Sequence, residues 1–354
     1  MRTFRLAKEE EEGSIFELLR QEGLERHLDY DTWSRQMRWW KTNWGPSEST
    51  IGTVMEIDGV VAGFAGHRLA EFKIGDGVRP GLFLGSFVIE KKQRGVGGLL
   101  LARHIVSQKE QYPVYGTHFN EALGKTWAFV GAQKLEGTNR TYVGVVSWRN
   151  AILQRVHTLR LLAPFLSLAD LPFLRSFWES WTGMSRCRVT GNWGLTVTVE
   201  SSLESCGEAT VVELCKKFEA AYDFGVLRSF GYLNWRYEKH PHSRCRWVVI
   251  NDGSAVIGMA VLRLRSNGRA FIDEIIFDPS IPEIESKCLD GVLRCAETLG
   301  ISVLISKSVL PAMADSFLRK GFSEQQKKYE QGLSATEGDV AGRLLFTYGD
   351  FNFD

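Results

Sequence analysis

The spacing of apolar residues divides the first half of the chain into short strands and helices. Residues 82–89, LFLGSFVI, form the kind of apolar run that fills a buried strand, and residues 98–106 continue with apolar side chains at helical spacing. The pattern around this pair predicts strands at residues 1–6, 113–120 and 138–148, helices at 14–19, 32–41 and 121–130, and a hairpin of 51–57 and 60–72 that turns at Asp58-Gly59.

The second half repeats this order of elements. It predicts strands at 195–199, 247–250, 255–264, 270–277 and 301–305, and helices at 210–220, 231–237, 284–298 and 311–320. Phe87 precedes Gly131 by 44 residues, and Phe277 precedes Gly321 by the same number. A chain of 354 residues also exceeds one comfortable hydrophobic core. We therefore expect two copies of one fold, at residues 1–149 and 194–354, joined by a helical apolar connector at 150–193.

A glycine-rich turn, residues 91–98, lies between a predicted strand and a predicted helix. Gly95, Gly97 and Gly98 carry no side chain that would block a phosphate, and the free amides of a helix start attract anions. A Walker A loop is excluded because leucines follow Gly98, and the glycine spacing does not fit the dinucleotide fingerprint. The turn therefore predicts a site for a pyrophosphate-bearing ligand.

This turn resembles the acyl-coenzyme A loop of the GCN5-related N-acetyltransferases, which has the pattern Q/R-x-x-G-x-G/A. Lys92, Gly95 and Gly97 match it, with Lys in place of the usual Arg or Gln. Further matches lie on the next strand and helix, at Asn120, Trp127 and Gly131. The resemblance implies an α/β (α+β) fold of two tandem acetyltransferase-like domains, each with a mixed, mostly antiparallel sheet flanked by helices. It also implies coenzyme A, as acetyl-CoA or another acyl-CoA, as co-substrate.

The resemblance further implies which residues bind the coenzyme. They lie at the end of the strand before the loop, in the loop, and on the following strand and helix: Phe87, Val88, Ile89, Lys92, Gln93, Arg94, Gly95, Val96, Gly97, Gly98, Asn120 and Trp127. Only the first half is expected to bind it. An offset of 190 places Glu285 opposite Gly95 and Lys287 opposite Gly97, and a carboxylate there would repel a pyrophosphate.

Transfer of an acyl group to an amine needs a group that accepts the proton of the amine. His67 and His118, on predicted strands near the expected cleft, are the titratable candidates, and Ser86 would line the same gap. The alternative for each of these three residues is an ordinary packing residue of a strand. Asp273 and Glu274 of the second half are weaker candidates.

Two roles in the chemistry follow from the resemblance. A backbone amide near Phe87 or Val88 is expected to hold the oxyanion at the thioester carbonyl. Trp127 stands where many family members have a Tyr that protonates the leaving thiolate. An indole cannot donate a proton usefully, so no protein general acid is assigned.

Residues 232–237 and the tail 345–354 look like features of two-domain N-acyltransferases from bacterial surface-polysaccharide pathways. Those enzymes acylate an amino group on a nucleotide-linked deoxy sugar. Trp235, Arg236 and Tyr237 would then bind the acceptor, through stacking faces and a bidentate phosphate donor. The alternative is a packed amphipathic helix end with one solvated Arg.

Composition limits the partners. The formal net charge is +1 with both signs mixed along the chain, which argues against a nucleic-acid partner. The six cysteines show no CxxC pair or Cys/His spacing, so we expect no metal site and a reduced, cytoplasmic setting. Charges and prolines interrupt the apolar connector, so we expect no integral membrane association. The connector would suit the interdomain groove or a contact in a homo-oligomer, and loose attachment to a membrane surface is the alternative.

The sequence thus predicts a cytoplasmic, acyl-CoA-dependent N-acyltransferase that acts on a nucleotide-linked amino deoxy sugar, a precursor of surface polysaccharide. Two alternatives stay open. One is an N-acetyltransferase for another small amine. The other is a non-catalytic acyl-CoA-binding scaffold, which the missing Tyr and the lack of a defined base favour.

Overall fold

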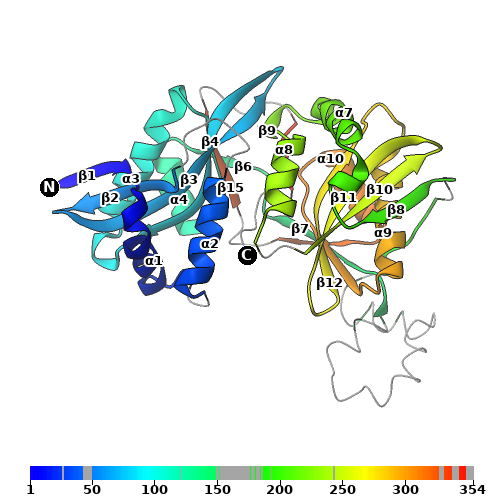
Figure 1. Cartoon of the computed structure of the whole chain (residues 1–354), viewed down its shortest axis with the longest axis horizontal. Coiled ribbons are helices and arrows are strands. Elements are labelled where there is room, and N and C mark those ends of the chain that lie inside the picture. The colour runs from blue at the N-terminus through cyan, green and yellow to red at the C-terminus, as the bar shows by residue number, and fades with distance from the viewer. Residues whose placement is uncertain are drawn as a thin grey trace, which may run out of the picture.

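The computed structural model contains two halves, each built on a twisted mixed sheet with helices packed against it (Figure 1). The structure describes residues 1–25, 28–42, 50–119, 121–148, 151, 176, 180, 184, 186–191, 193–241, 244–326, 331–336 and 343–347. Most of the expected connector at 150–193 and the end of the tail, 348–354, lie outside the described residues, as does Asn120. No helix in the described part of the chain is long and apolar enough to cross a membrane.

The first sheet has a parallel pair at its centre and antiparallel neighbours elsewhere. In spatial order its strands are β1 (Arg2–Leu6), β2 (Gly52–Ile57), β3 (Val60–Ile74), β4 (Gly77–Ile89), β5 (Val114–Phe119), β15 (Gln331–Ala335) and β6 (Gln133–Leu135). The expected hairpin forms, and both Asp58 and Gly59 have positive φ, at 51° and 85°, as a two-residue primed turn requires.

Two helix layers cover this sheet. The helices are α1 (Glu12–Gln21), α2 (Tyr30–Lys41), α3 (Val96–Val106) and α4 (Glu121–Phe129). Phe64 of β3 belongs to the core that holds Trp33 of α2, whereas its neighbour Ala65 belongs to the core that holds Leu101 of α3 and Trp127 of α4. Because successive strand side chains point to opposite faces, α2 covers one face and α3 and α4 cover the other.

The second half repeats the plan. Its sheet has the strand order β14 (Ser323–Gln326), β7 (Arg140–Val145), β13 (Val303–Ser306), β12 (Arg269–Phe277), β11 (Ala255–Leu264), β10 (Cys245–Asp252) and β8 (Thr196–Glu200). Its helices are α7 (Glu208–Phe218), α8 (Phe230–Leu233), the π-helical turn η8 (Asn234–Glu238), α9 (Ile284–Thr298) and α10 (Pro311–Arg319). Among the described strands of this sheet, β12 and β13 are the pair that runs parallel, as β4 and β5 do in the first half.

Each half contributes a strand to the sheet of the other half, across the boundary expected at residue 149. β7, which the sequence places at the end of the first domain, pairs with β13 and β14 in the second sheet. β15, which comes late in the second half, lies between β5 and β6 in the first sheet. A further short strand, β9 (Phe224–Val226), pairs with β3. The two halves therefore exchange strands.

Short elements complete the chain. They are the 3-10 turns η1 (Glu9–Glu11), η2 (Lys91–Gln93), η3 (Ser107–Glu110), η6 (Glu204–Cys206) and η7 (Glu219–Ala221). The sequence pattern did not predict β6, β9, β14 or β15, each of which is three to five residues long.

Candidate active site

The two parallel strands of the first sheet, β4 and β5, separate beside a bulge in β4. β4 and β5 pair at only three positions, ending at Leu84 with Gly116, although β4 continues to Ile89. On the other side, Gly85 and Ser86 of β4 stand opposite a single residue, Gly66 of β3. An extra residue of this kind bends a strand and ends its pairing. Residues 85–89, which we call the open edge of β4, therefore lie beyond the parallel pairing with β5.

The glycine-rich turn, residues 91–98, follows directly and is called the phosphate loop below. Gly95 is the N-cap of α3 with a φ of 84°, a conformation that favours glycine. The first helical hydrogen bond runs from the Leu99 N–H to the Gly95 carbonyl, at 2.9 Å. The N–H groups of Val96, Gly97 and Gly98 thus form the helix start, where the peptide dipoles favour an anion.

The residues present fit a coenzyme with a pyrophosphate and a thioester arm. A Cβ atom on Gly97 would lie 3.2 Å from the side chains of Gln93 and Met55, so this tight approach of helix and loop admits glycine best. Trp127 of α4 packs against Phe87 at the open edge, with ring centroids 5.5 Å apart. Its buried Nε1 donor has no hydrogen-bond partner among the described residues, and buried polar groups usually have one. A ligand in the opening could accept from it.

A small pocket lies on the α2 face, beside the bulge. Its lining includes Gly85 and Ser86, the aromatic rings of Trp33, Trp39, Trp40 and Phe64, and the side chains of Gln36 and Glu25. Its volume is about 40 Å³, and it is called the acceptor pocket below, after the role proposed for it. Glu25 is a non-glycine residue with a φ of 52°, an uncommon conformation for a Glu. Sequence reasoning missed Glu25, because spacing alone gives no sign of a pocket on the turn after α1.

The three candidate catalytic residues have different positions. Ser86 lines the acceptor pocket. The side chain of His67 points to the same face of the sheet as that of Ala65, away from α2. Its Nε2 lies 2.8 Å from Thr53 Oγ1, and the residue is 2 % exposed. Burial lowers the pKa of His67 to about 4, so its imidazole is neutral and weakly basic at neutral pH. His118 is in β5, and its side chain lies outside the described part of the structure.

The proposed acceptor-binding residues of the second half form the contact between the halves. Trp235 of η8 stacks on Trp39 of α2, with centroids 4.5 Å apart and planes 3° apart. Each indole N–H donates to the carbonyl of the other residue, at 2.8 and 3.1 Å. Arg236 is buried with its guanidinium 5.8 Å from the Trp39 ring, and the Tyr237 hydroxyl donates to Glu274 at 3.1 Å. The geometry therefore matches the packed-helix alternative, but Arg236 is buried and not solvated.

Arg68 of β3 is a further buried cation beside this contact that sequence reasoning missed. Its guanidinium lies 4.2 Å from the Trp235 ring centroid and donates to the Trp40 carbonyl at 2.8 Å. Burial is the main cause that lowers the pKa of Arg68 to about 9, so the group stays charged at neutral pH. Its charge also lies 5.5 Å from the ring centroid of Trp40, which lines the acceptor pocket.

The described residues of the second half contain no comparable phosphate loop. The N-cap of α9 is Glu283, with a φ of 56°, so the structural equivalent of Gly95 is Glu283, at an offset of 188 where the sequence comparison used 190. Glu285 then stands opposite Gly97. Side chains and two carboxylates replace the bare amides of the first half.

The opening between the central strands of the second half is occupied by the chain itself. β12 and β13 pair as far as Ile272 with Ser306, and Asp273 forms a bulge there. Leu345 and Thr347 of the tail line the space beyond, which has a volume of only about 10 Å³. Asp273 is bound by Arg263 at 2.7 Å, and Glu274 by Arg228 at 3.1 Å, so both weaker candidate bases are in buried ion pairs.

Among the described residues, no group of three or more His, Cys, Asp or Glu side chains could hold a metal ion. No protein-family model and no curated protein matches the sequence.

Solved structures do match the whole fold. One is a conserved protein of unknown function from Enterococcus faecalis V583, described as a probable N-acyltransferase (13 % identity, TM-score 0.57, 94 % of this chain and 72 % of that one). Another is a GCN5-related N-acetyltransferase from Anabaena variabilis ATCC 29413 (10 %, TM-score 0.60, 94 % and 72 %). A third is the N-myristoyltransferase of Saccharomyces cerevisiae with bound myristoyl-CoA (8 %, TM-score 0.54, 97 % and 80 %). The chain therefore has the fold of the GCN5-related N-acetyltransferases, in two copies that exchange strands.

Proposed function

We propose that the chain transfers an acyl group from acyl-coenzyme A to the amino group of a small-molecule acceptor. The bulge at Gly85 and Ser86 carries this proposal. On one side of it the open edge of β4 leads to the phosphate loop, and on the other side Ser86 lines the acceptor pocket. A thioester carbonyl and an amine must come within about 3–3.5 Å to react, and this short segment borders both sites.

The coenzyme would supply an acyl group activated as a thioester. The N–H groups of Val96, Gly97 and Gly98 would bind its pyrophosphate, and Lys92 and Arg94 of the loop would add positive charge. A main-chain N–H of the open edge, at Phe87 or Val88, would donate to the carbonyl oxygen as negative charge develops on it.

Glu25 is the group that we propose as proton acceptor for the amine. Glu25 lines the same pocket as Ser86, whereas His67 lies on the opposite face of the sheet with a pKa of about 4. A carboxylate among aromatic rings also attracts a protonated amine, which then has to lose its proton before attack. His118 is the second candidate for the proton acceptor.

The acceptor class that we propose is a nucleotide-linked amino deoxy sugar, on the resemblance of residues 232–237 and of the tail to enzymes of that kind. The aromatic walls of the acceptor pocket suit the apolar face of a sugar ring. The volume of about 40 Å³ favours entry of the amino group and its nearest atoms, with the rest of the molecule outside. Another small amine would satisfy the same pocket.

A cytoplasmic setting is part of the proposal. Cys187 and Cys295 are buried, and burial raises the pKa of Cys187 to about 12 and that of Cys295 to about 11. These thiols are therefore protonated and unreactive at neutral pH.

Release of free thiol from acetyl-CoA and longer acyl-CoAs tests the proposal, with dTDP- or UDP-linked amino sugars and simple amines as acceptors. We expect release that depends on the amine. Glu25→Gln should lower kcat/KM about 100-fold and flatten its pH profile, because a general base contributes about 10²–10⁴. Glu17→Gln, an exposed acid on α1, is the control and should behave as the wild type. Coenzyme binding without release would favour the scaffold, and an unchanged Glu25→Gln variant would place the base elsewhere.

A further inference from the structure

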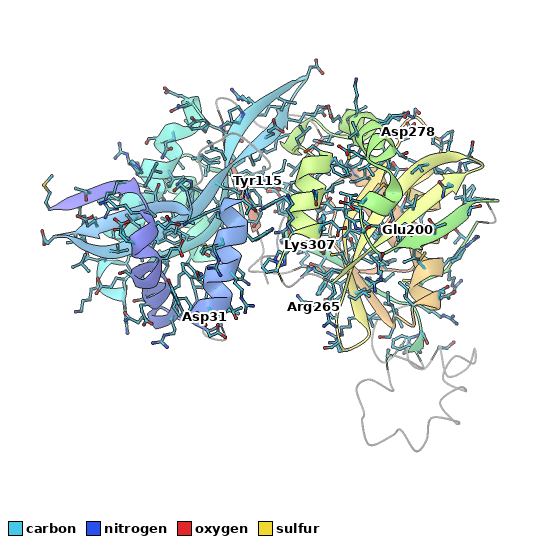
Figure 2. The ribbon with its side chains drawn as sticks, in the orientation of Figure 1. Asp31, Tyr115, Glu200, Arg265, Asp278 and Lys307 are labelled. Carbon is cyan, nitrogen blue, oxygen red and sulfur yellow. The ribbon has the colours of Figure 1, made fainter. Side chains whose placement is uncertain are left out.

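A second and larger hollow lies at one end of the second sheet. Its volume is about 610 Å³, within the ~300–1,000 Å³ of most ligand pockets. Arg244 and Arg246 at the start of β10 and Arg265 after β11 line it, together with Tyr237 and Glu238 of η8. We call it the arginine hollow. Figure 2 labels Arg265 on the margin of the second half that is nearer to the first half in this view.

The arginine hollow has an excess of positive charge. Within the described part of the chain, none of its three guanidinium groups forms an ion pair with a carboxylate. Glu238 is the acid of its lining, and Oε1 of that carboxylate already accepts from the Leu203 N–H at 2.7 Å and the Trp247 indole at 2.6 Å. Three positive charges in one hollow repel one another. An anion bound there would relieve this repulsion and be attracted by all three guanidinium groups.

Arg265 is held in place without being neutralised. Its guanidinium lies 5.4 Å from the ring centroid of Phe271. Arg263 lies against the same ring, at 4.8 Å, and binds Asp273 through two hydrogen bonds of 2.7 and 3.1 Å. The nearby carboxylate of Asp273 is thus taken by Arg263. An oriented, exposed guanidinium is the donor that matches two phosphate oxygens at once.

We infer that the arginine hollow binds the diphosphate of the acceptor, an inference that rests on the proposed function. The sequence assigned the phosphate to Arg236, but that side chain is buried against Trp39. η8 connects the two sites: Trp235 packs on Trp39, which lines the acceptor pocket, and Glu238 lines the arginine hollow.

Binding of inorganic pyrophosphate tests the inference directly. Calorimetry would be done on the full chain saturated with desulfo-coenzyme A, so that the phosphate loop is filled. We expect one site whose affinity falls with salt. The double variant Arg244→Gln/Arg265→Gln should weaken it about tenfold or more, because hydrogen bonds to charged groups are strong. The matched control Arg103→Gln/Arg319→Gln removes the same charge from exposed positions elsewhere and should stay within about twofold of the wild type.

Absence of a pyrophosphate site in the wild type, or equal weakening in both double variants, would overturn the inference. Kinetics separate it from the proposed function. The Arg244→Gln/Arg265→Gln variant should raise KM for the nucleotide-linked amino sugar and leave KM for the free amino sugar unchanged. If neither acceptor is acylated by the wild type, the proposed function fails, while the pyrophosphate titration still decides whether the arginine hollow is a diphosphate site.

Discussion

Glu22, at the end of α1, ties that helix to the phosphate loop. Its Oε1 accepts from the Lys91 N–H at 2.8 Å, and its Oε2 pairs with the guanidinium of Arg94. The Glu22 side chain is 11 % exposed and that of Arg94 is 56 % exposed. The Glu22 carboxylate is therefore paired with Arg94, the loop cation that the phosphate of the proposed coenzyme would need.

Replacing Glu22 with Gln should raise the affinity for coenzyme A by about 1.4- to fivefold. The amide oxygen can still accept from Lys91, so the loop keeps its backbone contact, while Arg94 becomes free to meet a phosphate. The size follows from ~0.2–1 kcal/mol for an exposed ion pair. Titration of coenzyme A into Glu22→Gln and into the control Glu17→Gln measures it. Weaker binding in Glu22→Gln alone would mean that Glu22 supports the loop and does not compete with the ligand.

Individual residues show what the sequence could and could not predict about the site. Gly95 was predictable, because a turn between a strand and a helix with a positive φ calls for glycine at that point. Glu25 and Arg68 were not, because neither belongs to a motif and their surroundings come from distant parts of the chain. Trp235 was chosen for its aromatic face, but whether that face meets a ligand or Trp39 depends on how the halves dock.

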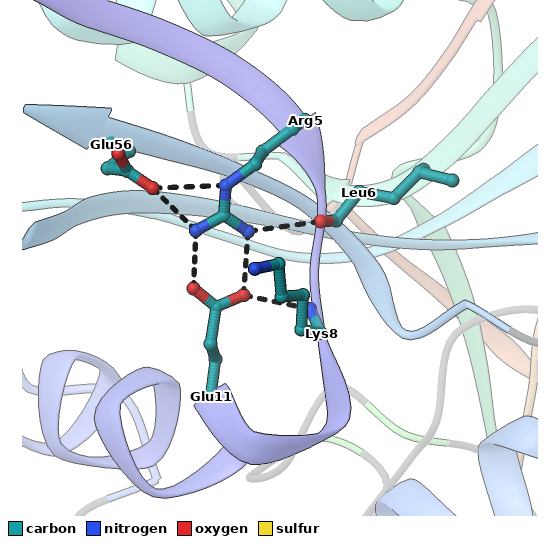
Figure 3. Close-up of polar contacts among 5 residues, drawn as sticks. All are labelled: Arg5, Leu6, Lys8, Glu11 and Glu56. Atoms are coloured by element: carbon teal, nitrogen blue, oxygen red, sulfur yellow. Dashed lines mark hydrogen bonds and ion pairs between the residues drawn. The ribbon is translucent and has the colours of Figure 1, made fainter. Parts of the chain in front are cut away.

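At the scale of elements, Arg5 joins β1, β2 and the turn η1, as Figure 3 shows. Its Nε donates to Glu56 at 3.0 Å, one terminal nitrogen donates to Glu11 at 2.8 Å, and the Lys8 N–H donates to Glu11 at 2.8 Å. The hydrogen bond from Arg5 is the main cause that holds the pKa of Glu11 below its ordinary value. The entry into α1 is thereby fixed to the edge of the first sheet.

This cluster should make stability depend on pH. A carboxyl whose pKa is lower in the folded state stabilises the fold above its unfolded pKa of about 4.3 and loses that contribution as the pH falls through the folded pKa. Glu11→Gln should therefore cost about 1 kcal/mol at pH 7 and progressively less below about pH 4. Urea unfolding of the wild type and variant at several pH values measures this. Glu10→Gln, a neighbouring exposed acid, should show no such loss, and a pH-independent difference would contradict the account.

Periodicity predicted the long elements well, because nine or more residues in β11, α9 or α10 display a clear period. It also predicted that residues 138–148 contain a strand, which is β7. It could not predict the sheet that β7 joins. The 44-residue spacing within each half is the same whether the last strand pairs in the sheet of its own half or in that of the other. Side-chain packing therefore decides which sheet the strand joins.

At the scale of the whole molecule, the exchange of β7 and β15 should make the halves fold as one unit. Of the two fragments produced separately, 1–175 should lack β9 and β15 of its sheet and 176–354 should lack β7. β7 alone buries Tyr142 and Val145 in the second half, worth ~1.5–3 kcal/mol each, against ~5–15 kcal/mol for a typical domain. We expect neither fragment to unfold cooperatively alone, and co-expression to restore a stable complex.

Calorimetric unfolding of the fragments and of the co-expressed pair is the measurement. A sharp transition in fragment 1–175 by itself would contradict the coupling. An intact chain with two well-separated transitions would do so as well, because strands shared between sheets should unfold together.

The place of β15 also has a consequence for how the protein is made. A ribosome completes β1 to β6 long before it reaches residues 331–335, so the nascent first sheet has a vacant slot between β5 and β6 while about 200 further residues are synthesised. Until then, both flanking strands present unpaired main-chain groups, the usual starting point of aggregation. Translation speed and chaperone supply should therefore govern the yield of this protein more than the stability of its finished form does.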